Sequence, residues 1–163
     1  MSDLKVEIPQ VVQALADRIA IQDRVVRTCT SLDQRNWDAY VECYTQDATI
    51  SYTHNDAVQT PAEFIAQVSP RLANFPLMQH LAVNFTVEAN GGEATCQTYC
   101  VAYMGPLGRR DSGVWRAASS IYNDRLVWRG DTWLIRTRQA ELQWEDGPAG
   151  KPLGAAGQDP AAV

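Results

Sequence analysis

Apolar residues recur at helical spacing through the first part of the chain. Between Pro9 and about Leu32 this pattern predicts one long helix, with Pro9 in its first turn. Asn36 is a suitable cap for a second helix, from Trp37 to about Tyr44. The apolar positions are Val12, Leu15, Ala16, Ile19, Val26 and Leu32 in the first helix, and Ala39, Tyr40 and Cys43 on the core side of the second.

A short strand and a third helix follow. Residues Thr49–Thr53 are rich in β-branched and aromatic side chains, which favour a strand. Thr60 then has the character of a helix cap, with Pro61 at the first helical position and Glu63 completing a capping box. We expect this helix to run to about Ala73.

The remainder of the chain alternates between apolar and polar residues, which predicts consecutive antiparallel strands. The expected strands are Leu77–Ala89, Glu93–Met104, Trp115–Trp128 and Thr132–Trp144. Helices followed by long strands predict an α+β fold, in which the N-terminal helices close the concave face of a cone-shaped sheet and leave an inner cavity. We assign residues 1–145 to one such domain and residues 146–163, rich in Gly, Pro and Ala, to a flexible tail.

Charge and composition narrow the function classes. The chain has 163 residues and a formal net charge of −5, with an isoelectric point near 4.9, which argues against nucleic acid or an anionic membrane as a partner. No apolar run approaches the length of a membrane span, and the first residues lack the apolar core of a signal peptide. We therefore expect a cytoplasmic protein.

The four cysteines do not suggest a metal site. Cys96 and Cys100 are four residues apart in an expected strand, so their α-carbons should be about 13 Å apart, too far for a disulfide. The chain has no closely spaced cysteine or histidine pairs of the kind that bind zinc. We interpret these two cysteines, with Cys29 and Cys43, as reduced and mostly buried thiols.

Asp33 occupies an electrostatically unfavourable position at the end of the first expected helix. A carboxylate near a helix C-terminus faces the negative end of the helix dipole. We therefore expect a cationic or proton-sharing partner for the Asp33 carboxylate.

The order of several short motifs resembles the SnoaL-like branch of the nuclear-transport-factor-like superfamily, over roughly residues 10–144. The motifs lie at residues 21–23, 32–37, 47–48, 60–63 and 130–135. The resemblance is nearest to scytalone dehydratase, bile-acid dehydratase and hexachlorocyclohexane dehydrochlorinase. It implies an α+β barrel, a small-molecule substrate, no metal or organic cofactor, and a homodimer or homotrimer formed through the outer face of the sheet, where Trp115 and Trp128 could contribute.

The resemblance also assigns catalytic residues. In the dehydratase and dehydrochlorinase members an aspartate ends the first helix, where this chain has Asp33. Their catalytic histidine lies four residues before an asparagine, as His80 does before Asn84. An arginine five residues after the tryptophan of the last strand points into their cavity, and this position after Trp133 is Arg138.

One position departs from the family pattern. Five residues before the aspartate, these enzymes carry a lysine or tyrosine that helps the leaving group, whereas this chain has Thr28. Tyr122 is a candidate substitute, and Tyr52 and His54 are weaker ones. The residues that we expect to contact substrate are Tyr122, Thr28, Tyr52, Phe75 and Asn84.

A His–Asp pair suits proton abstraction, because imidazole titrates near neutral pH and a carboxylate on its other nitrogen fixes the tautomer. Arg138 could balance the negative charge that develops. We therefore predict a lyase of the dehydratase or dehydrohalogenase type acting on a compact apolar molecule. A polyketide cyclase or isomerase using the same pair, and a noncatalytic binding or assembly subunit, remain alternatives.

Each of these residues also has a structural interpretation. Asp33 could simply cap the turn that follows it. Arg136 and Arg138 alternate on the last strand, so both should lie on one face, and if that face is exposed Arg138 is a surface residue. Tyr122 and Tyr52 could serve only in packing.

Overall fold

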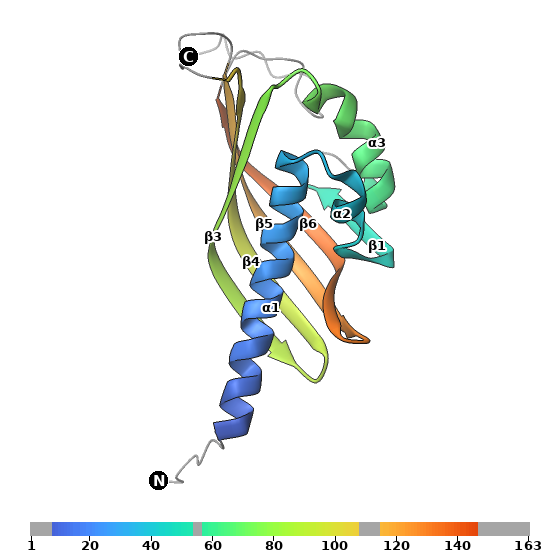
Figure 1. Ribbon diagram of the computed structural model, residues 1–163, viewed down its shortest axis with the longest axis vertical. Coiled ribbons are helices and arrows are strands. Elements are labelled where there is room, and N and C mark those ends of the chain that lie inside the picture. Colours follow the sequence, from blue (N-terminus) through green and yellow to red (C-terminus); the bar gives the residue numbers. More distant parts are fainter. Residues whose placement is uncertain (1–7, 54–56, 108–114, 147–163) are drawn as a thin grey trace.

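The computed structural model describes residues 8–53, 57–107 and 115–146. In these residues three helices precede or interrupt a curved six-stranded sheet (Figure 1). The helices are α1 (Ile8–Asp33), α2 (Trp37–Val41) and α3 (Pro61–Leu72). The strands are β1 (Tyr44–Tyr52), β2 (Val58–Gln59), β3 (Leu77–Asn90), β4 (Glu93–Gly105), β5 (Arg116–Arg129) and β6 (Thr132–Asp146). The α+β prediction is thus confirmed. His54 and the predicted tail from residue 147 onward lie outside the described residues.

Helix α1 lies across the concave face of the sheet, and its N-terminal turns extend beyond the strands (Figure 1). The residues that bury it against the sheet are Ile21, Val25, Thr28, Cys29, Ser31 and Leu32. Most of the apolar residues that predicted this helix, among them Val12, Leu15 and Ile19, are exposed instead, and Leu32 is the member of that set that is buried. The helix therefore carries two separate apolar stripes, and only the second packs against its own core.

The turn between α1 and α2 places Asp33 at the edge of the interior. Arg35 takes a left-handed backbone conformation with φ of 55°, which ends α1. Asn36 caps α2, as predicted, by accepting a hydrogen bond of 3.1 Å from the Ala39 amide. Helix α2 is shorter than predicted because the Cys43 carbonyl already accepts a hydrogen bond of 3.0 Å from Ile135 of β6, so β1 begins at Tyr44.

The predicted capping box at the start of α3 is present. The Thr60 hydroxyl accepts a hydrogen bond of 3.3 Å from the Glu63 amide, and the Thr60 amide donates one of 2.8 Å to the Glu63 carboxylate. Both backbone groups would otherwise lack partners at the helix end. This anchored helix leans over one side of the sheet together with α2 (Figure 1).

The strands are ordered β2-β1-β6-β5-β4-β3. Strands β3 to β6 form the consecutive antiparallel hairpins that the sequence predicts, with bounds within two residues of the expected ones. Strand β1 instead pairs parallel with β6, and the two-residue strand β2 adds to its other edge. Neither pairing was predicted. The β1–β6 pairing joins segments distant in sequence, and β2, although it follows β1 closely along the chain, has only two residues.

A bulge in β6 overturns the prediction that Arg136 and Arg138 share a face. The pairing with β5 shifts between Arg125 and Leu126, and Arg136 is the extra residue. A bulge reverses the side-chain alternation that follows it. Arg136 consequently lies at the surface near Asp47, whereas Arg138 is buried with 3% of its surface exposed.

A second bulge explains the conformation of Asn84. Its φ of 54° lies in the left-handed region, and the β3–β4 pairing shifts between Val83 and Thr86 at the same place. Asparagine tolerates this conformation better than most residues. The bulge keeps His80 and Phe85, five residues apart, both partly buried.

The interior combines apolar side chains from all layers. The main cluster includes Ile21 and Val25 of α1, Ile50 of β1, Phe64 of α3 and Ile135 of β6. All four cysteines are free and buried, as predicted. None of the helices in the described part of the chain is long and apolar enough to cross a membrane.

Candidate active site

An inner cavity of about 170 Å³ lies between α3, the end of α1 and the concave face of the sheet. Its walls are mainly apolar, and the apolar residues include Leu32, Phe64, Val68, Leu72, Phe75, Met104 and Leu142. The polar side chains on the walls are those of Tyr52, Gln67, Arg71, His80, Arg116, Ser120, Tyr122 and Glu145. Such a mostly apolar cavity with a few polar groups is typical of a small-molecule site.

Asp33 and His80 are in contact at the edge of this cavity. Nδ1 of His80 lies 2.5 Å from Oδ1 of Asp33, and the His80 backbone amide donates a hydrogen bond of 2.9 Å to Oδ2. Because a carboxylate oxygen accepts, Nδ1 must carry the shared proton. The two side chains are 10% and 20% exposed for His80 and Asp33, and only His80 lines the cavity. Among the described residues, the carboxylate at the end of α1 thus has the partner that its position required.

Arg138 lies deeper than the cavity walls. Its Nε and Nη2 donate hydrogen bonds of 2.8 and 2.7 Å to the two carboxylate oxygens of Asp124, which is 2% exposed. Its Nη1 donates one of 3.0 Å to the Thr28 hydroxyl. The guanidinium also lies 4.4 Å from the centre of the Tyr122 ring. Its charge is therefore balanced by Asp124, and Tyr122 is the cavity residue that it touches.

Thr28 and Asn84, both expected to contact substrate, are not among the residues that line the cavity. Thr28 is fully buried, and its hydroxyl donates to the Val25 carbonyl at 2.7 Å while accepting from Arg138. Asn84 is exposed at the β3 bulge. Thr28 is thus engaged in holding Arg138, and Asn84 shapes the strand that carries His80.

Tyr122, Tyr52 and Phe75, which were also expected to contact substrate, line the cavity. Burial raises the pKa of the Tyr122 and Tyr52 hydroxyls, so both stay protonated at neutral pH and can donate hydrogen bonds. A side-chain nitrogen of Arg35 bonds the Phe75 carbonyl, which fixes the segment before β3. The turn that positions Asp33 therefore positions Phe75 as well.

The thiols of Cys29 and Cys100 lie just behind these groups. Their mutual hydrogen bond, followed by burial, raises the pKa of Cys29. The same bond lowers the pKa of Cys100 to about 6, against the effect of burial, which raises it. Both cysteines are only 2% exposed and neither lines the cavity, so we assign them to its support.

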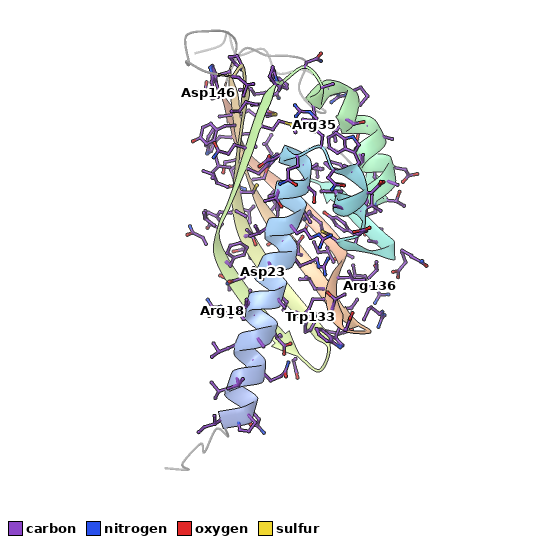
Figure 2. All side chains as sticks on the ribbon, in the orientation of Figure 1. Arg18, Asp23, Arg35, Trp133, Arg136 and Asp146 are labelled. Carbon is purple, nitrogen blue, oxygen red and sulfur yellow. The ribbon has the colours of Figure 1, made fainter. Side chains whose placement is uncertain are left out.

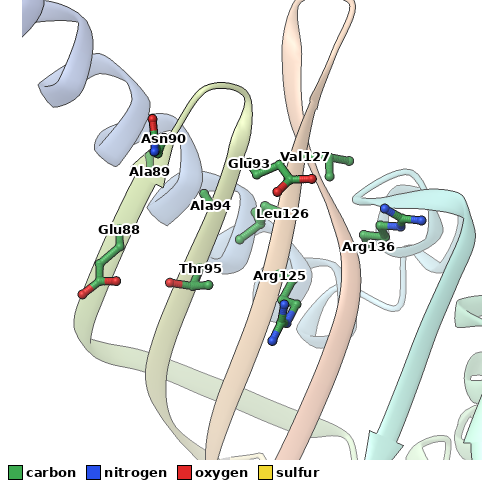
Figure 3. Close-up of a pocket in the computed structure, with 10 residues that line it drawn as sticks. All are labelled: Glu88, Ala89, Asn90, Glu93, Ala94, Thr95, Arg125, Leu126, Val127 and Arg136. Atoms are coloured by element: carbon green, nitrogen blue, oxygen red, sulfur yellow. The ribbon is translucent and has the colours of Figure 1, made fainter.

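A second hollow, of about 380 Å³, lies at the far end of the sheet. It is lined by residues of β3, β4 and β5 together with Arg136 of β6 (Figure 3). Charged side chains of both signs face it, including Glu88, Glu93 and Arg125. None of the predicted site residues lines it, so the cavity beside His80 is the candidate active site. Within residues 8–53, 57–107 and 115–146, no group of three or more His, Cys, Asp or Glu side chains is arranged to hold a metal ion.

Two features of this site were missed from the sequence. Asp124 lies two residues beyond Tyr122, so strand alternation places both on one face, and this was an available signal. The ion pair between Arg116 and Glu145 on the cavity wall had no such signal. These residues belong to different strands and meet only through the register of β5 with β6.

The curved sheet, the helices over its concave face and the enclosed polar groups define a nuclear-transport-factor-like α+β protein. The chain belongs to the SnoaL-like family, because the model of the SnoaL-like domain matches residues 13–139. An uncharacterized protein of Mycobacterium tuberculosis, Rv2910c, is 31% identical over 132 residues, which span 78% of this chain and 86% of that protein.

Solved structures share the fold. A scytalone dehydratase-like protein from Novosphingobium aromaticivorans superposes with a TM-score of 0.73 at 16% identity, covering 90% of this chain and 99% of that chain. A hexachlorocyclohexane dehydrochlorinase, LinA type 2, superposes with a TM-score of 0.69 at 14% identity, covering 93% and 99%. At such identities these likenesses establish the fold alone.

Proposed function

We propose that this chain is a cofactor-independent lyase of the dehydratase or dehydrohalogenase type, with His80 as its base. The observation that carries the proposal is the 2.5 Å contact of His80 Nδ1 with Asp33, combined with the position of the same ring on the wall of an apolar cavity. The fold shared with a dehydrochlorinase and a scytalone dehydratase-like protein supports it.

With Nδ1 donating to Asp33, Nε2 is the ring nitrogen left to accept a proton from substrate. It removes a proton from a carbon, the C–H electron pair forms a carbon–carbon double bond, and the leaving group departs from the adjacent carbon with its bonding pair. Asp33 stabilises the imidazolium that forms. When the leaving group is hydroxide, the imidazolium can supply the proton that converts it to water.

Tyr122 is the donor that we assign to the leaving group. Its hydroxyl stays protonated because burial raises its pKa, and it lines the same cavity as His80. Arg138 enters the proposal as a positioning residue, because its guanidinium packs on the Tyr122 ring and is neutralised by Asp124. This arrangement replaces the lysine or tyrosine that Thr28 does not supply.

The Tyr122→Phe variant should retain the fold and lower kcat by about tenfold or more with little change in KM, because the hydrogen bond to the leaving group strengthens in the transition state. Steady-state kinetics of the variant and the wild type would measure this. Tyr99→Phe is the matched control, since Tyr99 is 42% exposed on β4 and is not part of the cavity wall. An equal kcat in Tyr122→Phe and wild type would remove Tyr122 from the mechanism.

A screen of compact cyclic compounds tests the reaction class. Each candidate should carry a halide or hydroxyl next to an acidic C–H bond, and product analysis should find loss of HX or water with a new double bond. Ring closure or double-bond migration without loss of a leaving group would instead favour the cyclase or isomerase alternative, which the SnoaL-like family membership supports. A noncatalytic subunit is less well supported, since it predicted a disrupted Asp33–His80 pair.

A further inference from the structure

The N-terminal part of α1 exposes a continuous apolar stripe. The exposed fractions are 78% for Ile8, 59% for Val12, 54% for Leu15, 56% for Ile19 and 37% for Val26. Successive members are four, three, four and seven residues apart. In the last interval, between Ile19 and Val26, the position that would continue the alternation of three and four is occupied by Gln22. This is the spacing of a heptad seam, and the seam runs for about 27 Å at 1.5 Å per residue.

The stripe is distinct from the face that packs against the sheet. The buried residues of α1, among them Ile21, Val25 and Leu32, are turned by about 120° from the stripe at 100° per residue. A surface helix of a globular protein normally has one apolar face and a polar remainder. Within the described residues, α1 therefore has a second apolar face with nothing packed on it.

The residue types along the stripe favour a two-stranded contact. The a positions of the heptad are occupied by Val12, Ile19 and Val26, and the d positions by Ile8, Leu15 and Gln22. β-Branched residues at a with leucine at d favour parallel dimers over larger assemblies. In a parallel pair in this register the two Gln22 side chains face each other, so each has a polar neighbour within the seam.

The charges beside the stripe are complementary to those of a second parallel copy. Arg18 lies at a g position and Asp23 at the following e position, five residues later, and both lie on α1 (Figure 2). In a parallel pair the g residue of one helix meets the e residue five positions on in the other helix. Neither Arg18 nor Asp23 takes part in an ion pair within the part of the chain that the structure describes.

We propose that this face of α1 docks on the same face of a second copy of this chain in a parallel two-helix seam. Arg18 then pairs with the partner's Asp23, and two-fold symmetry repeats the pair on the other side. This interface uses neither the outer face of the sheet nor any cavity residue, so it stands independently of the proposed lyase activity.

Sedimentation velocity across the micromolar range tests the seam in the full chain. The wild type should be a dimer, and Ile19→Glu should raise the dimer dissociation constant by at least about tenfold, because it places an unpaired charge in the seam. Val58→Glu is the control, since Val58 is 66% exposed on β2. A monomeric wild type overturns the proposal, as does a dimer that survives Ile19→Glu but dissociates with Tyr99→Glu on the outer face of the sheet.

Charge reversal tests the pairing. Arg18→Glu and Asp23→Arg should each weaken the dimer, and the double variant should restore it because the attraction returns with exchanged signs. Asp131→Arg, in the turn between β5 and β6, is the control for net charge. A double variant that is weaker than both single variants would overturn the pairing of these two residues.

Cysteine cross-linking tests whether the two α1 helices of the dimer run parallel or antiparallel. In a parallel seam each a position faces itself, so Val12→Cys and Ile19→Cys should each form disulfide-linked homodimers under mild oxidation by molecular oxygen, two thiols losing two electrons and two protons. Wild type is the control, because its four cysteines are buried. An antiparallel pair centred between these positions would cross-link only when the two variants are mixed, and that result would overturn the parallel arrangement.

Discussion

The His80→Ala variant should lose at least about a hundredfold in kcat on any substrate that the screen identifies, because a positioned general base contributes that much or more. Asp33→Asn should cost a comparable factor. Its amide can donate to Nδ1, which moves the ring proton to Nε2 and removes the acceptor from the cavity. Rates would be measured by release of halide or by absorbance of the new double bond.

The control for both variants is Gln79→Ala. Gln79 is the neighbour of His80 on β3, but it is exposed and does not line the cavity. It should keep the wild-type rate, and thermal unfolding should show that all three variants fold. Near-wild-type turnover in a folded His80→Ala or Asp33→Asn variant would contradict the catalytic role of the pair.

The second large effect concerns stability. Asp124→Asn should lower the free energy of unfolding by about 3–5 kcal/mol, because it leaves the buried Arg138 guanidinium without a counter-charge. The side chains of Arg138 and Asp124 are 3% and 0% exposed, so solvent cannot compensate for the lost charge. Denaturant unfolding at neutral pH would measure the loss.

Removing both charges provides the matched comparison. The double variant Asp124→Leu/Arg138→Met should be more stable than Asp124→Asn, since replacing a buried ion pair by apolar groups is often nearly neutral. Tyr122 would lose the cation against its ring, so this variant should still turn over slowly. An Asp124→Asn protein within about 1 kcal/mol of wild type would show that the guanidinium is not confined as the structure describes.

Local chemistry made much of the fold predictable. Two helix caps were recognisable from residues at most three positions apart, and both are present in the structure. They are the capping box of Thr60 and Glu63 and the cap at Asn36. The alternation of apolar and polar residues from Leu77 onward predicted the antiparallel strands, with bounds within two residues of those observed. The α1 stripe misled in one respect, because helical periodicity reports an apolar face without saying what covers it.

The bulges at Arg136 and Asn84 show where inference from the local sequence was no longer sufficient. A bulge depends on how two strands pair, which the sequence of either strand does not specify. Arg136 shows the consequence, since one extra residue moved Arg138 from an expected shared face to the interior. The parallel pairing of β1 with β6 has the same origin.

The part of the candidate site around Asp33 was predictable, because a carboxylate at a helix C-terminus requires a partner. The resemblance to the dehydratases indicated His80 as that partner, and the two side chains are in contact. Strand alternation could have placed Asp124 on the same face as Tyr122, but its pairing with Arg138 depends on the β5–β6 register, which the sequence does not specify. The role of Thr28 could not be inferred from the sequence, and the structure shows that its hydroxyl accepts a hydrogen bond from Arg138.

The most direct test of the proposed base is the tautomer of His80, measured by long-range ¹H–¹⁵N correlation near neutral pH. The chain has two histidines, so a His80→Gln variant assigns the signals. We predict a protonated Nδ1, bonded to Asp33, and an unprotonated Nε2 that can accept a proton in the cavity. A neutral ring protonated at Nε2 would contradict the account, because the nitrogen assigned to accept the substrate proton would already carry one.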